Sequence, residues 1–399
     1  MPMSRRALIA QAAMLAVFGG RARAQPLPYD ALIQDYFAKN DLMGLEAAVV
    51  AQGKPVWTGA CGTADAARRM PMTPDTVVNI ASLSKTVTAA AVMRLAERGL
   101  IRIDDDATAH LPFAVRNPLY DAEPITIRHL LAHVSSVADG PAYAQSYVCG
   151  PAQESLGAWL EAYFAARARG NFHPWPPGEK FAYSNVGYGL LGAVVETVSG
   201  SPFAQFCEAE IFRPLGMART SAGAARVPPE QQAVDYTLTA KADAAGRIMP
   251  ERGSLPAAAK GQVYIANCAY SFPTAPDGLV RTSAADFARF LASMAGGGAY
   301  EGHHLLHPAS LDEMFREQFA KAQRPAGWPV AQGLAWCAMR APDGGFVWMH
   351  NGADPGVNTL AVLHRPTKSA VALFANSAPA AGLGELAGTC LQLATGARK

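Results

Sequence analysis

The sequence predicts an α/β protein of the α+β kind, with one antiparallel sheet built from both chain ends, flanked by terminal helices. Two observations predict this. Short β-rich runs separated by turn residues occur near both ends of the chain, each set accompanied by a helix. The middle instead holds amphipathic helical runs broken by proline-rich loops. We therefore expect a sheet domain from residues 25–95 and 281–399, and a mainly helical inserted subdomain from residues 96–280.

The first 24 residues have the pattern of a cleaved export signal. Arg5 and Arg6 form the charged start, residues 7–20 are mainly apolar, and a small-x-small site ends at Ala24 before Gln25. The adjacent arginines favour a twin-arginine signal, and a general secretory signal is the alternative. We expect cleavage near Ala24/Gln25 and a periplasmic protein with no membrane span in its mature form.

The N-terminal part of the sheet domain is predicted to contain a helix, two strands and a second helix. The first helix covers residues 30–39, and the strands cover residues 45–50 and 56–59 on either side of a Gly-Lys-Pro turn. The second helix covers residues 87–98, is rich in alanine, and is closed by Gly99.

Ser82 and Lys85 lie at the head of this second helix. Residues three positions apart are one turn apart on the same helix face, so the lysine amine lies beside the serine hydroxyl. Free serine is too weakly acidic to attack an acyl carbon, and a neighbouring base or cation corrects this. The pair therefore indicates a serine nucleophile with an adjacent base.

The remaining elements follow in two groups. In the middle of the chain, residues 155–168 and 188–199 are predicted helices, and the Tyr183-Ser184-Asn185 segment directly precedes the second of them. Near the C-terminus, short β-rich runs are followed by a helix, and one run leads into His350-Asn351-Gly352. The predicted C-terminal strands cover residues 333–339, 346–349, 358–363 and 370–375, and the helix covers residues 384–394.

These three motifs, in this order, resemble those of serine hydrolases of the class C β-lactamase type. That group includes penicillin-binding DD-peptidases, D-aminopeptidases and β-lactamase-like carboxylesterases, with Ser-x-x-Lys, Tyr-x-Asn and Lys-Thr-Gly or His-x-Gly motifs. The resemblance covers about residues 29–398 and includes the segments 127–136, 177–185 and 278–283. It implies the β-lactamase/transpeptidase-like fold, with the active site in a cleft between the two subdomains.

The resemblance also implies roles for the first two motifs. Ser82 would be the nucleophile that forms an acyl-enzyme, and Asn185 would bind the acyl side chain of the substrate and help orient Lys85. Either Lys85 or Tyr183 would be the general base, since a phenol with a pKa of about 10 can act as a base when cations stabilise the phenolate. The sequence leaves this choice open.

In the third motif, the backbone N–H groups of Ser82 and Ala353 would bind the oxyanion, and Gly352 would let the substrate backbone approach a strand edge. Asn351 occupies a position that varies among relatives. The main departure is His350, because β-lactamases of this type carry a lysine that pairs with the substrate carboxylate. A histidine with a pKa of about 6.5 is mostly neutral at pH 7 and would gain a proton only below that pH.

This departure makes a carboxylesterase the first expectation. The alternatives are a D-alanyl-D-alanine carboxypeptidase or D-aminopeptidase, a weak β-lactamase and, from another class, a non-catalytic penicillin-binding-like protein. The expected partner is therefore a small ester, amide or β-lactam. A composition of 50% apolar and 17% charged residues, with a net charge of +2, suits a globular enzyme and indicates no nucleic-acid partner. The sequence gives no indication of the oligomeric state.

No metal or cofactor is expected. His129 and His133 are spaced like zinc ligands on a helix, but the residues between them include no glutamate and no third ligand is evident. The six cysteines contain no Cys-x-x-Cys pair. Cys61 and Cys337 lie in strand-like runs, whereas Cys149 and Cys268 lie in loop-like segments and are candidates for one disulfide in an oxidising compartment.

Overall fold

The computed structural model describes residues 28–165, 169–223, 227–238, 257–259, 262–325, 330–341, 344–378 and 382–396. The predicted export signal at residues 1–24 lies outside these ranges, so it stays a prediction. Within the described part of the chain, we find no helix with the length and apolar character needed to cross a bilayer.

An eight-stranded sheet forms the centre of the molecule, and every ladder in it is antiparallel. The N-terminal strand β1 lies between its hairpin partner β2 and the C-terminal strand β18, with Leu45 opposite Ala375. The prediction of one sheet assembled from both chain ends is therefore confirmed. In sheet order the strands are β14 (Ala331–Gln332), β15 (Cys337–Arg340), β16 (Phe346–Asp354), β17 (Val357–His364), β18 (Ser369–Ala375), β1 (Gly44–Ala51), β2 (Lys54–Asp65) and β3 (Met70–Pro71).

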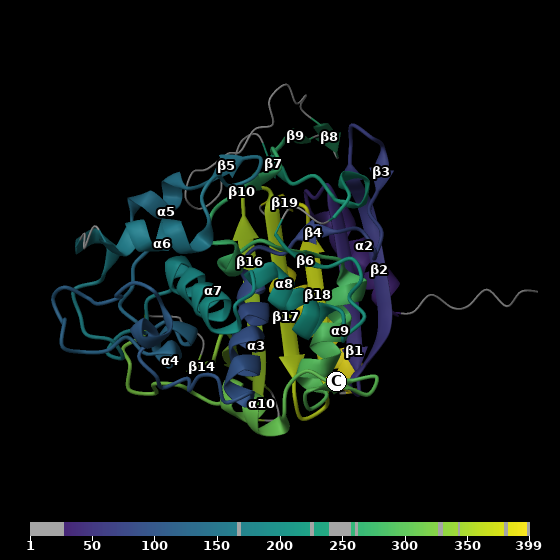
Figure 1. Ribbon diagram of the computed structural model, residues 1–399. Helices are drawn as coiled ribbons and strands as arrows, with labels where there is room; N and C mark the ends of the chain where they lie inside the picture. The colour runs from purple at the N-terminus through teal and green to yellow at the C-terminus, as the bar shows by residue number, and fades with distance from the viewer. Residues whose placement is uncertain are drawn as a thin grey trace, which may run out of the picture.

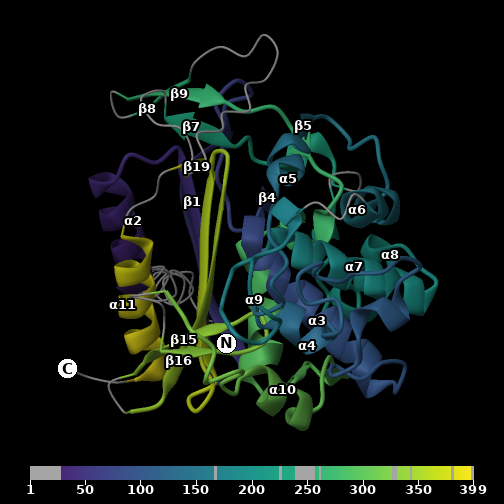
Figure 2. The same ribbon diagram turned by 90° about the vertical axis from the view of Figure 1, so that its left-hand side faces the viewer.

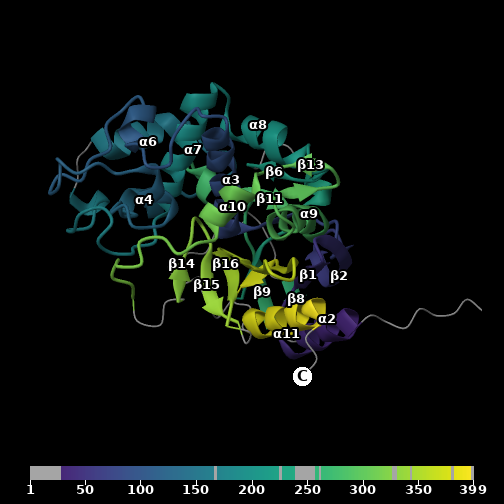
Figure 3. The same cartoon turned by 90° about the horizontal axis from the view of Figure 1, so that it is seen from below.

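Helices cover both faces of this sheet (Figure 1). The terminal helices α2 (Pro28–Lys39) and α11 (Leu383–Thr395) lie side by side on one face, where they enclose one apolar core with the outward side chains of the strands (Figure 2). On the other face, α9 (Ala284–Ala295) packs against β1 and β18, and α3 (Ser84–Glu97) lies beside it in a second, larger core (Figure 3). The sheet is thus the middle layer of the fold.

The middle of the chain contains helices together with short strands that the sequence pattern did not predict. The largest helix is α7 (Asn185–Ser199), which packs against α3. The domain boundaries expected at residues 95 and 281 stay a prediction. The other helices of this region are α4 (Ile127–Leu131), α5 (Pro141–Gln145), α6 (Leu156–Ala165) and α8 (Phe203–Cys207). The short strands are β5 (Val148–Cys149), β6 (Ser221–Ala222), β7 (Tyr236–Leu238), β8 (Ala257–Ala259), β9 (Gln262–Ala266), β10 (Tyr270–Ser271) and β11 (Val280–Thr282).

A smaller set of elements completes the chain. β4 (Val78–Asn79) pairs with β11 just before the Ser82 motif, and β19 (Ser377–Ala378) pairs with β7. The hairpin β12 (Ala299–Tyr300) and β13 (His303–His304) precedes α10 (Pro308–Met314).

The expected disulfide between Cys149 and Cys268 is confirmed. Cys149 ends β5, and Cys268 lies just before β10, the partner of β5. The bond therefore joins two segments 119 residues apart in the chain, with their Cα atoms 5.6 Å apart. Cys61 and Cys337 lie in strands β2 and β15 as expected, although both are half-buried and not fully in the core.

Several observed bounds differ from the predicted ones: β2 continues to Asp65, and the predicted strand 333–339 is a strand only from Cys337, with β14 ending at Gln332. Two further elements are longer than predicted at the motifs. β16 continues from the predicted end at residue 349 to Asp354, because pairing with β17 extends through the polar third motif, with His350 opposite Ala361 and Gly352 opposite Thr359. α7 begins at Asn185, since the Ser184 side chain accepts a hydrogen bond from the Gly187 N–H and caps the helix. Both extensions carry motif residues into regular elements.

Candidate active site

Ser82 lies on a 3₁₀ turn, Ala81–Leu83, that leads directly into α3. The preceding Ala81 has φ 48°, a left-handed conformation that is uncommon for a residue other than glycine. Asn79 holds this turn, since its side-chain oxygen accepts a hydrogen bond of 3.0 Å from the Ala81 N–H. The result is a partly exposed Ser82 between two buried neighbours.

Lys85 lies one turn further along, in the first turn of α3, and its side chain is fully buried. Its Nζ lies 3.2 Å from Ser82 Oγ, 2.7 Å from Asn185 Oδ1 and 2.7 Å from the backbone oxygen of Asp277. A buried ammonium is costly unless its N–H groups have acceptors, and here each has one. The structure therefore brings the Ser82 hydroxyl and the Lys85 amine into hydrogen-bond contact, as the spacing predicted.

Tyr183 is the third member of this cluster. The side chains of Ser82 and Lys85 lie near enough to its hydroxyl for hydrogen bonds to influence its pKa, and the Lys85 Nζ lies 4.9 Å from the centre of its ring. Burial raises the pKa of Tyr183 above its usual value, while the Lys85 charge and these hydrogen bonds act in the opposite direction. Since the net shift is upward, Tyr183 is a neutral phenol in this site at neutral pH.

Asn185 begins α7, and its amide is held on both sides. Its oxygen accepts the hydrogen bond from Lys85, and its Nδ2 donates one of 2.8 Å to Asp139 Oδ2. The Asp139 carboxylate also accepts hydrogen bonds from the backbone N–H groups of Asn185 and Val186, at the helix end where a negative charge is favoured. Asp139 therefore fixes which face of the Asn185 amide points to Lys85.

The His133 ring packs against the Tyr183 ring. The two rings stack with centroids 4.3 Å apart, and His133 Nδ1 accepts a hydrogen bond of 3.2 Å from the Ser184 N–H. Burial holds the pKa of His133 well below its usual value, with Lys85 and His350 acting in the same direction, so the ring is neutral. Sequence reasoning gave no role to His133 or Asp139. The available signal was the Leu-Leu-x-His segment, of which His133 is the last residue and which Asp139 follows.

The two histidines spaced like zinc ligands are thus used otherwise. His129 Nδ1 accepts a hydrogen bond from the Thr126 N–H in a capping box of α4, and His133 faces Tyr183. Among the residues that the structure describes, no group of histidine, cysteine, aspartate and glutamate side chains could hold a metal ion.

The third motif lies on β16. His350 and Gly352 are buried, and Asn351 and Ala353 are exposed, as expected for alternate residues of a strand. A Cβ on Gly352 would lie 2.4 Å from the Ile80 oxygen and 3.1 Å from the Ser82 nitrogen, so only glycine lets β16 pass this close to the serine turn. β15 pairs with β16 only over residues Phe346 to Met349. Residues 350–354 of β16 therefore do not pair with β15.

His350 contacts the cluster through its ring. Its centroid lies 6.4 Å from that of Tyr183, and its Nδ1 lies 2.7 Å from the backbone oxygen of Asn351. Burial, together with the Lys85 charge, lowers the pKa of His350 to about 3. The expectation that this histidine titrates near pH 6.5 is therefore wrong, since the sequence does not reveal the burial that disfavours the charged ring.

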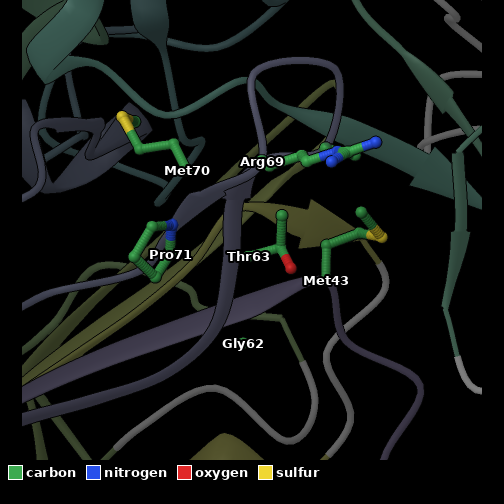
Figure 4. A pocket seen from close by; sticks show the side chains of 7 residues that line it. Met43, Gly62, Thr63, Arg69, Met70 and Pro71 are labelled. Atoms are coloured by element: carbon green, nitrogen blue, oxygen red, sulfur yellow. The ribbon is translucent and has the colours of Figure 1, made fainter.

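The pocket shown in Figure 4 lies elsewhere, beside the β2–β3 edge of the sheet. It contains none of the residues of the three motifs. Its lining includes Met43, Gly62, Thr63, Arg69, Met70 and Pro71.

Comparison with known proteins gives matches over most of the chain. The family model described as Beta-lactamase matches residues 29–392. The D-alanyl-D-alanine-carboxypeptidase/endopeptidase AmpH of Escherichia coli (strain K12) is 26% identical over 298 residues, which is 72% of this chain and 68% of that protein. Penicillin-binding protein 4* of Bacillus subtilis (strain 168) is 26% identical over 312 residues, which is 77% of this chain and 62% of that protein.

Solved structures show the same fold. The D-amino acid amidase from Ochrobactrum anthropi SV3, complexed with L-phenylalanine, has a TM-score of 0.72 and 24% identity, and the match covers 93% of this chain and 99% of that chain. The octameric penicillin-binding protein homologue from Pyrococcus abyssi has a TM-score of 0.72 and 24% identity, covering 92% and 77%. The fold class expected from the sequence is confirmed.

Proposed function

Because this chain belongs to the Beta-lactamase family of serine hydrolases, we propose that it hydrolyses small esters and neutral amides through an acyl-enzyme on Ser82. The observation that carries this proposal is the contact of Ser82 Oγ with the buried Lys85 Nζ, 3.2 Å apart, beside the Tyr183 hydroxyl. A hydroxyl within hydrogen-bond reach of an amine and a phenol is the arrangement that nucleophilic catalysis by serine requires.

In the proposed reaction, Ser82 Oγ forms a bond to the acyl carbon while its proton passes to the base. The backbone N–H groups of Ser82 and Ala353 bind the oxyanion, and collapse breaks the bond to the alcohol or amine, which leaves with a proton from the site. Water then attacks the acyl-enzyme with the same groups acting in reverse, so the acid is released and Ser82 regains its proton.

The contacts of Lys85 suit it as the first proton acceptor. In the amine form it has two N–H donors, which match the two shorter contacts, to Asn185 Oδ1 and the Asp277 oxygen. Its lone pair is then left for the Ser82 hydroxyl. Tyr183, a neutral phenol with a raised pKa, is suited to donate the proton that the leaving group needs.

The choice of substrate rests on His350. A ring with a pKa of about 3 is neutral at every pH where such an enzyme works, so His350 supplies no positive charge to a substrate carboxylate. Esters and amides that lack a free carboxylate do not need a positive charge at this position. β-Lactams and peptide C-termini carry a carboxylate, so they bind less well without that charge. We therefore place carboxylesterase activity first and β-lactamase activity last.

The second candidate is a peptidase or amidase that acts on D-amino acid derivatives. It is favoured by the similarity to AmpH, a D-alanyl-D-alanine-carboxypeptidase/endopeptidase, over 72% of this chain. We also propose that the protein is exported to the periplasm, which the arginine pair and the apolar run of residues 1–24 support.

A panel of three substrates tests the ranking. We expect p-nitrophenyl butyrate to have the highest kcat/KM, with D-alanyl-D-alanine peptide and nitrocefin lower, because only the last two present a carboxylate to the neutral His350. Including D-alanine amide, which has no carboxylate, separates the amidase candidate from the carboxypeptidase. A higher kcat/KM for the D-alanyl-D-alanine peptide than for the ester would replace our first choice by the second.

Introducing a permanent cation at the third motif should shift substrate preference. His350→Lys is expected to raise nitrocefin hydrolysis relative to p-nitrophenyl butyrate hydrolysis by about fivefold, or about 1 kcal/mol, because a charged lysine would pair with the substrate carboxylate. The same ratio in the wild type should stay constant from pH 5 to pH 8, since His350 remains neutral throughout this range. His350→Gln, which adds no charge, is the control, and an equal ratio in both variants would mean that this position does not face the substrate carboxylate.

A further inference from the structure

A buried acid lies against the lysine of this site. Asp277 ends the 3₁₀ turn Ala275–Asp277, just before β11, and only 1% of its surface is exposed. Its backbone oxygen accepts the 2.7 Å hydrogen bond from Lys85, and its carboxylate Oδ1 lies 4.0 Å from the same Nζ. Among the described residues, it supplies the carboxylate that forms an ion pair with Lys85. None of the three motifs contains it.

The turn that carries Asp277 is clamped between α3 and α7. A Cβ on Gly192 would lie 2.1 Å from Pro276 Cγ, so α7 needs glycine there to approach the turn. From the other side, the Thr88 hydroxyl of α3 donates a hydrogen bond of 2.6 Å to the Pro276 backbone oxygen. The contacts with the two helices therefore fix the position of the turn that carries Asp277.

A phenol holds the carboxylate in place. The Tyr143 hydroxyl, on α5, donates a hydrogen bond of 3.1 Å to Asp277 Oδ1. Burial raises the pKa of Asp277 to about 7, against the opposing influence of the Lys85 charge and the Tyr143 hydrogen bond. This acid therefore changes charge within the range where the enzyme works.

The other titratable groups around the Lys85–Asp277 pair come from several elements. Tyr183, before α7, and Tyr188, on α7, face Lys85 with their rings. The further groups are His133 after α4, His350 on β16, and Asp139 before α5, whose charge raises the pKa of Asp277. Both histidines are neutral, and Asp139 is an exposed carboxylate bonded to the start of α7. Of these groups near Lys85, Asp277 is thus the buried one whose charge changes with pH near neutrality.

We propose that Asp277 is a positioning residue that sets, through its charge, how readily Lys85 and Tyr183 give up their protons. When Asp277 is ionised, its negative charge favours the ammonium form of Lys85 and raises the pKa of Tyr183. When Asp277 is neutral, Lys85 loses its counter-charge and the amine form is favoured. The groups titrate as a coupled set, so the pH dependence of the reaction belongs to the set and not to one residue.

The sign of the effect follows from this coupling. At any pH where Asp277 of the wild type is ionised, removing its negative charge favours the deprotonated form of either candidate base. Asp277→Asn should therefore move the acid limb of the kcat/KM profile, measured with p-nitrophenyl butyrate, to lower pH by about one unit. Asparagine keeps a side-chain oxygen that accepts the Tyr143 hydrogen bond, so the packing is preserved. An acid limb that coincides with that of the wild type, in a variant with an unchanged thermal unfolding midpoint, would overturn the proposal.

A matched control separates this local charge from the general effect of removing a buried acid. Asp235 is also buried and has a pKa raised to about 7, but its charged neighbours are Arg281 and Asp354 instead of Lys85. We expect Asp235→Asn to leave the acid limb where it is in the wild type. A shift as large as that of Asp277→Asn would contradict a specific role for Asp277.

A second variant keeps the proposal testable if Asp277→Asn does not fold. Tyr143→Phe removes the hydrogen bond that favours the ionised carboxylate, so it should move the limb in the same direction by a smaller amount. An acid limb that does not move in Tyr143→Phe would count against the proposal.

The inference rests on the proposed function, and Ser82→Ala distinguishes a failure of the inference from a failure of the function. Full activity of Ser82→Ala would reject the function itself, whereas an inactive Ser82→Ala with an unmoved Asp277→Asn limb would reject only the role of Asp277.

Discussion

Ser82→Ala is expected to abolish turnover of every ester and amide substrate, with kcat falling by about 10⁴-fold or more. The reason is that no acyl-enzyme can form without the Ser82 hydroxyl, which is the group in contact with both Lys85 and Tyr183. Hydrolysis of p-nitrophenyl butyrate measures the loss of rate. Labelling with a fluorophosphonate probe, followed by mass spectrometry of the peptides, identifies the residue that carries the label.

Ser84 provides the matched control, because it lies on the same stretch of chain but its hydroxyl has a structural role. It is fully buried, and its Oγ accepts a hydrogen bond of 2.9 Å from the Val280 N–H. Ser84→Ala should lower stability by about 1 kcal/mol and keep the label on Ser82. Equal labelling of the wild type and Ser82→Ala would remove Ser82 as the nucleophile.

Much of the fold was predictable because its signals are local. The β-rich runs at both ends and the helices beside them follow from side-chain periodicity, and pairing of β1 with β18 then makes one sheet. The motif residues also meet as expected, since the spacing of Ser82 and Lys85 on one helix face needs no tertiary information. The disulfide partners Cys149 and Cys268 could be proposed because both lie in loop-like segments.

The rest depended on contacts between distant segments. The end of β16 contains polar residues and glycine, and it is a strand only because β17 pairs with it. The low pKa of His350 comes from burial among other elements, which no pattern within β16 reveals. Asp277 lies outside the three motifs, and it reaches Lys85 because Gly192 lets α7 approach its turn. In each case, the missing information was which surfaces pack together.

Lys85→Ala and Tyr183→Phe are each expected to lower kcat/KM for p-nitrophenyl butyrate by about 10²-fold or more, the usual contribution of a positioned acid or base. Lys85→Ala removes the amine that contacts Ser82. Tyr183→Phe keeps the ring stacked on His133 and removes only the hydroxyl. Tyr188→Phe is the control, since its ring lies 5.7 Å from the Lys85 Nζ but its hydroxyl donates to the Leu131 oxygen. That variant should lose stability and keep its rate.

The pH dependence of these variants separates the two candidate bases. The pKa of Tyr183 is raised above 10, so a mechanism that uses the phenolate would have a wild-type rate that keeps rising towards that pH. Tyr183→Phe would then lose most activity at high pH. If Lys85 is the base and Tyr183 acts as a neutral phenol, the fold loss in Tyr183→Phe should be the same from pH 6 to pH 9. We expect this constant loss, because burial favours the neutral phenol. A loss that grows with pH would transfer the role of base to Tyr183.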